Sequence, residues 1–273
     1  MFRTSNPTLK NPYFGTGTNA VADVAMNRAG QGVGSATGPK VMTMQGTVNK
    51  TAFLVALCAA TAMGAWTLLE TRPGLMMPVV FGGAILGLVL VVVASFKPKT
   101  SPFVAPVYAI AEGGFVGGVS MMFAANAAKQ GSTFNTNLIF NAALLTFGIL
   151  GGLLVAYSLR LIRPNKMFYN VVIAGTIGAC LYAGIAMIAS LFGSFTLASV
   201  YDPNNGGLIS VGFSALLVVL ASANLVLDFD QIENGVRNRA PRYMEWFGGM
   251  SLLVTLVWLY IEVLRLLSKL RRD

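Results

Sequence analysis

Residues 75–96 read LMMPVVFGGAILGLVLVVVASF, without a charged side chain. A helix of this length can cross the roughly 30 Å hydrocarbon core of a bilayer, for which about 20 apolar residues are needed. Arg72-Pro73-Gly74 precede the stretch and Lys97-Pro98-Lys99 follow it, so charged and helix-breaking residues bound it on both sides. This pattern is typical of a transmembrane helix.

Similar apolar blocks recur along the whole chain. Charged residues make up 11% of its 273 residues, against about 25% in soluble domains, and the mean hydropathy is +0.68. These charges are too few to cover the surface of a soluble globule of this size. We therefore predict an all-α membrane protein, a bundle of seven transmembrane helices over residues 48–69, 75–96, 102–127, 134–158, 167–193, 207–229 and 247–269.

The polar residues ahead of the first block form a separate region. Residues 1–46 are rich in Gly, Asn, Thr and Ser, a composition too weakly hydrophobic to build a core. We predict a disordered polar N-terminal tail over residues 1–46 and a transmembrane helical bundle over residues 47–273.

Glycine pairs four residues apart recur within the blocks. Such pairs let helices approach closely in lipid, so we expect tight helix contacts at four of them: Gly83/Gly87, Gly113/Gly117, Gly114/Gly118 and Gly148/Gly152.

Several classes of chemistry are excluded by what the chain lacks. It has no histidine, which removes Ser-His hydrolysis and histidine metal sites. Its two cysteines, Cys58 and Cys180, lie in separate apolar blocks and form no CxxC motif. No GxGD motif of an aspartyl-type membrane protease occurs. We predict no enzyme and no cofactor.

The net charge of +9 is better explained by membrane topology than by nucleic-acid binding, because the basic residues lie between apolar blocks. With the N-terminus in the cytoplasm and seven full spans, most of the 19 Lys and Arg residues fall on the inner side, as the positive-inside rule expects. We predict a multi-pass protein of the bacterial cytoplasmic (inner) membrane with a cytoplasmic N-terminus. The side of the C-terminus stays open, since four basic residues follow residue 264.

Four carboxylic acids within or beside the apolar blocks need a reason, because a charge near the bilayer centre costs on the order of 3 kcal/mol. The first is Glu112, in the middle of the third block. It is either a protonated acid hydrogen-bonded to a neighbouring helix or a lining residue of an ion or proton path.

Asp228 and Asp230 end the sixth block. Residues two apart on a helix point about 200° away from each other, so they cannot both face one neighbouring helix. We expect Asp228, which lies deeper in the apolar run, to face the bundle and Asp230 to face the headgroups.

Glu262 lies in the last block, three residues before Arg265. One reading is a local ion pair with Arg265 that reaches to the membrane surface. The other pairs Glu262 with Asp228 across the hairpin of the last two helices, with residue 245 at its midpoint; the two acids lie at similar depth if the sixth helix continues to about Arg237. Two carboxyl groups close together in a site of low dielectric cannot both ionise at low cost, so such a pair would be sensitive to protons.

The order and spacing of three motifs resemble the Bax inhibitor-1 family, in particular its bacterial branch. They are Ala111-Glu112-Gly113, the stretch 227–230 (LDFD) and the stretch 257–267 (VWLYIEVLRLL). The resemblance covers the chain from Asn6 to its end. It implies helices wrapped around the last one, and an acidic pair on the sixth and seventh helices, here Asp228 and Glu262, that acts as a pH-sensing latch in a calcium leak pathway.

Two functions remain as alternatives. The first is a pH-sensitive leak channel for calcium or other cations, with Asp228, Glu262, Asp230 and Glu112 along the pathway. Calcium bound by Asp228 and Glu262 would be held weakly and transiently, because a tight site needs six to eight oxygen ligands. The second is a regulator that transports nothing and binds a membrane protease or another membrane complex, with the polar tail as a contact element.

Overall fold

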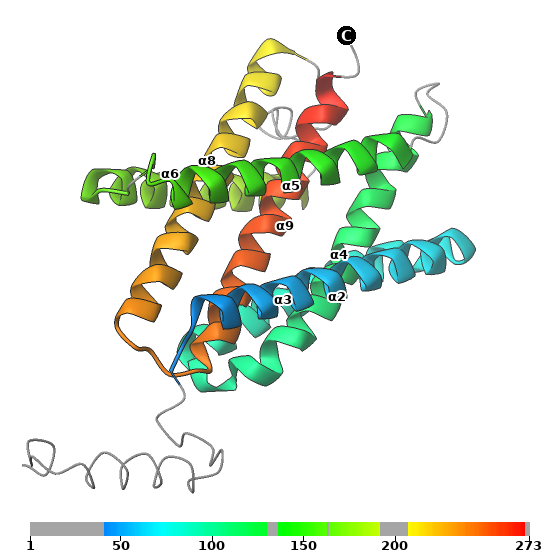
Figure 1. Cartoon of the computed structure of the whole chain (residues 1–273). Helices are drawn as coiled ribbons and strands as arrows, with labels where there is room; N and C mark the ends of the chain where they lie inside the picture. Colours follow the sequence, from blue (N-terminus) through cyan, green and yellow to red (C-terminus); the bar gives the residue numbers. More distant parts are fainter. Residues whose placement is uncertain (1–40, 130–135, 163, 192–206, 271–273) are drawn as a thin grey trace, which may run out of the picture. The chain divides into compact units, whose positions relative to one another are not determined.

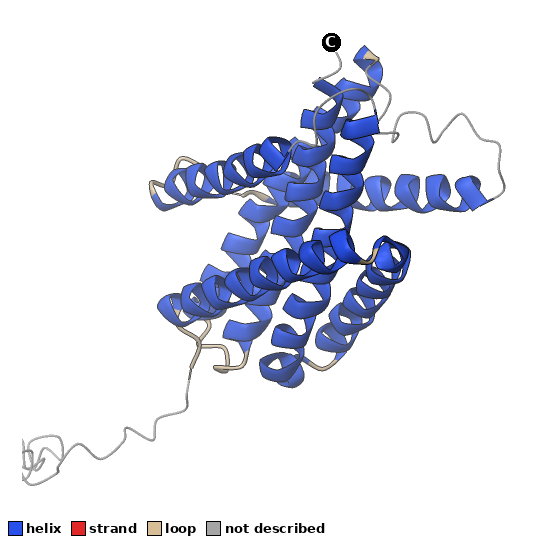
Figure 2. Ribbon diagram, turned by 90° about the vertical axis from the view of Figure 1, so that its right-hand side faces the viewer, coloured by secondary structure: helices blue, strands red, loops and turns tan. Residues whose placement is uncertain are grey.

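The computed structural model describes residues 41–129, 136–162, 164–191 and 207–270. Most of these residues are helical, and Figure 2 shows no strand among them. Residues 1–40 of the tail predicted over residues 1–46 lie outside the described ranges. The described helices are α2 (Met44–Thr71), α3 (Met76–Phe96), α4 (Ser101–Lys129), α5 (Thr136–Ser158), α6 (Lys166–Leu191), α8 (Leu208–Arg237) and α9 (Met244–Leu270), with 3-10 turns η3 (Pro73–Leu75) and η4 (Pro98–Thr100).

The seven predicted helices are confirmed, and most of their ends lie within three residues of the expected positions. The largest difference is in α8, which continues to Arg237 instead of ending at 229. The extra turns carry polar pairs at helical spacing: Asn234 donates to Asp230 (2.9 Å) and Arg237 pairs with Glu233 (2.8 Å). Such i,i+4 pairs stabilise a helix beyond its apolar part.

The first helix begins earlier than predicted because the residues before it are held in place. Thr43 caps α2 by accepting from the Gly46 N–H (3.0 Å). Just ahead of it, Met42 is buried and donates its N–H to the Ala240 carbonyl (2.7 Å). Residues 41–46, which we assigned to the tail, therefore belong to the helical region.

The same segment is tied to the start of α9 by Glu245, whose side chain is only 2% exposed. Glu245 Oε1 accepts from the backbone N–H and from the hydroxyl of Thr43, both at 2.9 Å. Its other oxygen forms an ion pair with Lys50 of α2. This buried contact joins the start of α2 to the start of α9.

The last helix is central in the described part of the chain. α9 packs against α2, α4, α5 and α8, and its buried residues run from Glu245 to Lys269. In Figure 1, the axes of α4, α8 and α9 are tilted in a similar way, with α8 antiparallel to α9, while α2, α3 and α5 cross them. The central last helix implied by the family resemblance is therefore present.

The predicted tight contact at the pair Gly113/Gly117 is present and joins α4 to α2. A Cβ atom built on Gly113 would lie 1.8 Å from Thr61 Oγ1 and 2.5 Å from the Cys58 carbonyl oxygen. One built on Gly117 would lie 2.5 Å from the Ala62 carbonyl oxygen. Only glycine permits this close approach of the two backbones.

The prediction of a tight contact is wrong for Gly148 and Gly152 of α5. A Cβ atom on either residue would meet nothing within 4 Å. The spacing of small residues alone does not show whether another helix packs on that face. None of the described residues packs on α5 at Gly148 and Gly152.

Large apolar side chains cover the outside of the helices. Examples more than half exposed include Phe81, Ile85, Leu88, Ile177 and Leu181. Seven helices in the described residues are long and apolar enough to cross a membrane. Such a surface fits a lipid bilayer, so the chain has the build of a multi-pass integral membrane protein.

Candidate functional site

Asp228 lies on α8 and faces α9, as predicted. It is 7% exposed, and two hydroxyl groups of α9 hold its carboxyl group. Ser251 donates to Oδ1 (2.7 Å) and Thr255 donates to Oδ2 (2.6 Å). The described structure therefore pairs this buried acid with hydroxyl groups and not with a basic side chain.

Sequence reasoning missed Ser251 and Thr255. Their signal is present in the chain: they are two hydroxyl residues at i,i+4 in an otherwise apolar stretch, residues 246–259, which places them on one face. Such a polar pair in a membrane helix needs a partner on the neighbouring helix, and that partner is Asp228.

Glu262 is 2% exposed and its partners lie on its own helix. Arg265 Nη1 donates to both carboxylate oxygens, at 3.0 and 2.8 Å, and the Trp258 indole N–H donates at 3.3 Å. The predicted local ion pair is thus present. It is buried rather than at the surface, because the Arg265 side chain is only 13% exposed.

A buried lysine lies one turn beyond Arg265. Lys269 is fully buried and donates to the Ser210 carbonyl (3.1 Å) and to the Ser214 hydroxyl (2.8 Å) of α8. The end of α9 therefore places two basic side chains near Glu262, and their charges compensate its negative charge.

The described structure does not bring Asp228 and Glu262 together, so the prediction that these two carboxyl groups form a pair is wrong. Asp228 meets α9 at Ser251 and Thr255. Seven residues of helix separate Thr255 from Glu262, a rise of roughly 10 Å. A shared calcium site for these two acids is lost with the pair, and no group of three or more His, Cys, Asp or Glu side chains in the described ranges could hold a metal ion.

Asp230 is half-buried and does not turn to the headgroups as expected. Tyr169 of α6 donates to its Oδ2 (2.5 Å), and Tyr157 of α5 lies 3.4 Å from its Oδ1. Tyr157 also donates to Glu233 (2.6 Å). Asp230 therefore joins α8 to α5 and α6, on the side of α8 away from Asp228.

Glu112 lies buried on α4, 9% exposed, against α3. A Cβ atom on Gly87 of α3 would lie 2.8 Å from Glu112 Oε2. Tyr108, one turn earlier on α4, interacts with its carboxyl group. Glu112 is thus at a different helix interface from Asp228, and the four acids do not form one site.

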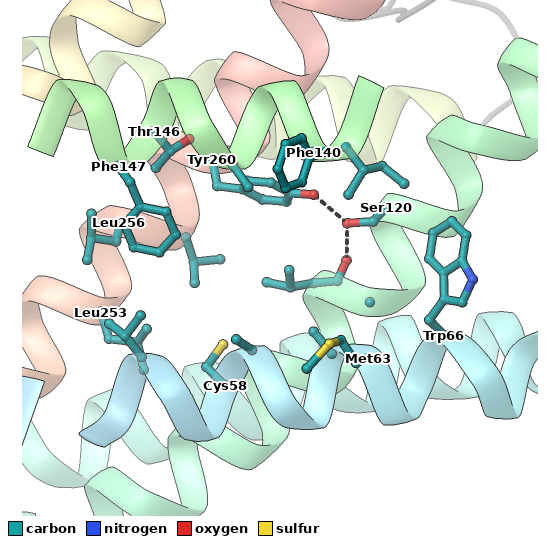
Figure 3. Close-up of a pocket in the computed structure, with 18 of the residues that line it drawn as sticks. Cys58, Met63, Trp66, Ser120, Phe140, Thr146, Phe147, Leu253, Leu256 and Tyr260 are labelled. Atoms are coloured by element: carbon teal, nitrogen blue, oxygen red, sulfur yellow. Dashed lines mark hydrogen bonds between the residues drawn. The ribbon is translucent and has the colours of Figure 1, made fainter. Parts of the chain in front are cut away.

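A cavity of about 680 Å³ lies between α2 and α5, with α4 and α9 as its other walls (Figure 3). Its walls are almost entirely apolar. Near its centre, Ser120 of α4 and Tyr260 of α9 share a hydrogen bond of 2.8 Å. The lining residues are Val55, Cys58, Ala59, Ala62, Met63, Trp66, Thr67, Val116, Gly117, Ser120, Ile139, Phe140, Ala143, Thr146, Phe147, Leu253, Leu256, Val257 and Tyr260.

Comparison with known proteins gives one match. Residues 6–272 match the model of the family described as Bax inhibitor 1 like. Neither the curated proteins nor the solved structures contain a match to this chain.

Proposed function

This chain belongs to the Bax inhibitor 1 like family, and from that premise we propose that it is a pH-sensitive leak pathway for calcium or other cations. The observation that carries the proposal is Asp228, a carboxyl group buried between α8 and α9 whose partners are two hydroxyl groups.

The surroundings of Asp228 suit a group that changes its protonation during function. An ionised carboxylate is costly to bury unless a basic side chain compensates it, and the two hydroxyl groups compensate it only in part. A cation passing between α8 and α9 would supply the missing positive charge. Protons and cations would then compete for the same oxygen atoms.

The ligand set also favours passage over storage. One carboxyl group with Ser251 and Thr255 offers four oxygen atoms, fewer than the six to eight that calcium takes in a tight site. Weak binding is what conduction needs, because the ion must leave as readily as it enters.

Glu262 has a different part in this proposal from the one that the resemblance implies. Its charge is already compensated by Arg265, so we assign proton sensitivity to Asp228 alone. Asp230 and Glu112 are secondary candidates along the pathway, on other faces of the helices.

We further propose that the start of α2 faces the cytoplasm of a bacterial cell. Lys50 at that end contacts the start of α9, next to Arg237 at the end of α8 and to Arg239 and Arg242 in the α8–α9 connection. Basic residues gathered at one end of the spans favour the cytoplasmic side.

The test is calcium flux into liposomes that contain the purified protein, measured across a pH series. We expect pH-dependent flux from the wild type and loss of most of it in Asp228→Asn. Glu233→Gln is the matched control, because this acid of α8 is 38% exposed, and it should leave the flux unchanged. Equal flux from wild type and Asp228→Asn would overturn the assignment.

A protein without flux would favour the regulator that binds another membrane complex. Deletion of residues 1–40 is the matching test, because it removes most of the tail and keeps Met42 and Thr43, which anchor α2. Loss of the cellular phenotype with intact flux would assign the function to the tail.

A further inference from the structure

The hydrogen-bond donors in the wall of the cavity between α2 and α5 are already used within the protein. Thr67 donates to the Gly64 carbonyl (3.0 Å) and Thr146 to the Ala142 carbonyl (2.8 Å). The Trp66 indole N–H donates to Glu70 (2.6 Å). The thiol of Cys58 is at most a weak donor. A ligand in this cavity would find almost no donor.

Ser120 and Tyr260 give the cavity an acceptor instead. A hydroxyl group has one hydrogen, and Ser120 donates its own to the Val116 carbonyl (2.7 Å), which can only accept. Either hydroxyl could donate in the 2.8 Å contact between Ser120 and Tyr260; with the Ser120 hydrogen on the Val116 carbonyl, this contact is a hydrogen bond only if Tyr260 donates. In this arrangement both hydroxyl hydrogens are used within the protein, and the Tyr260 oxygen can still accept a hydrogen bond; Figure 3 shows the two contacts of Ser120.

The cavity opens at the surface of the protein, because several residues of its wall are exposed. Met63, Phe140 and Phe147 line it and are 66%, 64% and 53% exposed. Apolar exposed side chains on helices that are long and apolar enough to cross a membrane fit a surrounding of lipid hydrocarbon. The volume of about 680 Å³ lies within the range of small-molecule sites, roughly 300–1,000 Å³.

We propose that this cavity binds a single-chain lipid whose polar end is a hydroxyl group. The aliphatic chain fills the apolar space between α2 and α5, and the hydroxyl group donates to Tyr260. An ester or ether at the same place could only accept, and it would leave the Tyr260 oxygen without a donor. This site lies apart from Asp228, and the proposal does not depend on cation transport.

The experiment uses the full-length protein in nanodiscs and a photoreactive analogue of hexadecan-1-ol with a diazirine in its chain. Competition by unlabelled hexadecan-1-ol is compared with competition by its methyl ether, which has the same chain and no donor. We expect the alcohol to compete about fivefold better, the gain typical of one hydrogen bond. In Tyr260→Phe this preference should disappear, whereas Tyr182→Phe on α6, outside the cavity wall, should retain it.

A second variant tests the location. Ala143→Trp would fill the cavity from α5 and should abolish labelling. Equal competition by the alcohol and the ether in the wild-type protein would overturn the proposal, as would the absence of labelling. Unchanged labelling of Ala143→Trp would also overturn it, because the probe would then bind elsewhere.

Discussion

The contact between α2 and α4 makes a quantitative prediction about Gly113. Replacing Gly113 with alanine would place a methyl group 1.8 Å from Thr61 Oγ1 and 2.5 Å from the Cys58 carbonyl oxygen. The threonine side chain can rotate, but the carbonyl belongs to the α2 backbone, so the two helices must separate. Overpacking of this kind costs about 1–3 kcal/mol, and the higher helix propensity of alanine returns up to about 1 kcal/mol. We expect Gly113→Ala to lower the free energy of unfolding by about 1–2 kcal/mol in total.

Gly148→Ala is the matched control, because a Cβ atom there meets nothing within 4 Å. It gains the same helix propensity without the clash and should be neutral or slightly stabilising. Both variants are measured by unfolding the purified protein in mixed micelles with increasing denaturing detergent, followed by tryptophan fluorescence. If Gly113→Ala were as stable as Gly148→Ala, α2 and α4 would not approach as closely as described.

Two further predictions concern buried charges and use the same unfolding titration. Arg265→Ala should lower the free energy of unfolding by about 3 kcal/mol or more, because Glu262 stays buried without its ion pair. Arg237→Ala should lower it by less than about 1 kcal/mol, because the pair of Arg237 with Glu233 is exposed. Equal losses would contradict the burial of the first pair. Glu245→Gln should lower the free energy of unfolding by roughly 1–3 kcal/mol. It should also speed amide hydrogen exchange over residues 42–47, because Glu245 accepts two hydrogen bonds from Thr43 in that segment. Unchanged exchange would show that other contacts hold the segment.

The helices could be predicted from the sequence because lipid imposes one strong rule. Every buried backbone group must be bonded within its own segment, so long apolar blocks become helices. The end of α8 was missed for a related reason. The sixth helix was expected to end near Asp228 and Asp230, but Asn234 and Arg237 continue it through pairs with earlier residues.

The position of the turn between α8 and α9 explains the wrong carboxyl pair. The hairpin was centred on residue 245, which places Glu262 opposite Asp228. The observed connection covers residues 238–243, so its centre lies about four residues earlier. Asp228 then faces the region near residue 253, between Ser251 and Thr255. An error of a few residues in the position of the α8–α9 connection therefore shifts the predicted partner of Asp228 by about two turns along α9.

The environment of each acid depends on side-chain contacts that spacing does not encode. Asp228 and Asp230 were expected to point in opposite directions, and they do. The tyrosines that donate hydrogen bonds to Asp230 come from α5 and α6 and lie more than 60 residues earlier in the chain. Only the packing of α8 against these helices decides that Asp230 meets tyrosines instead of headgroups.

The central claim is that Asp228 titrates independently of Glu262. The most direct measurement is pH-difference infrared spectroscopy of the purified protein, with the Asp228 carboxyl band assigned through its absence in Asp228→Asn. The ion pair is removed as a unit in Glu262→Gln/Arg265→Gln, so that no buried charge is left alone. We predict that the midpoint of the Asp228 band stays within about half a pH unit of the wild type. A change of more than about one unit, the mark of strongly interacting sites, would contradict the separation of the two acids.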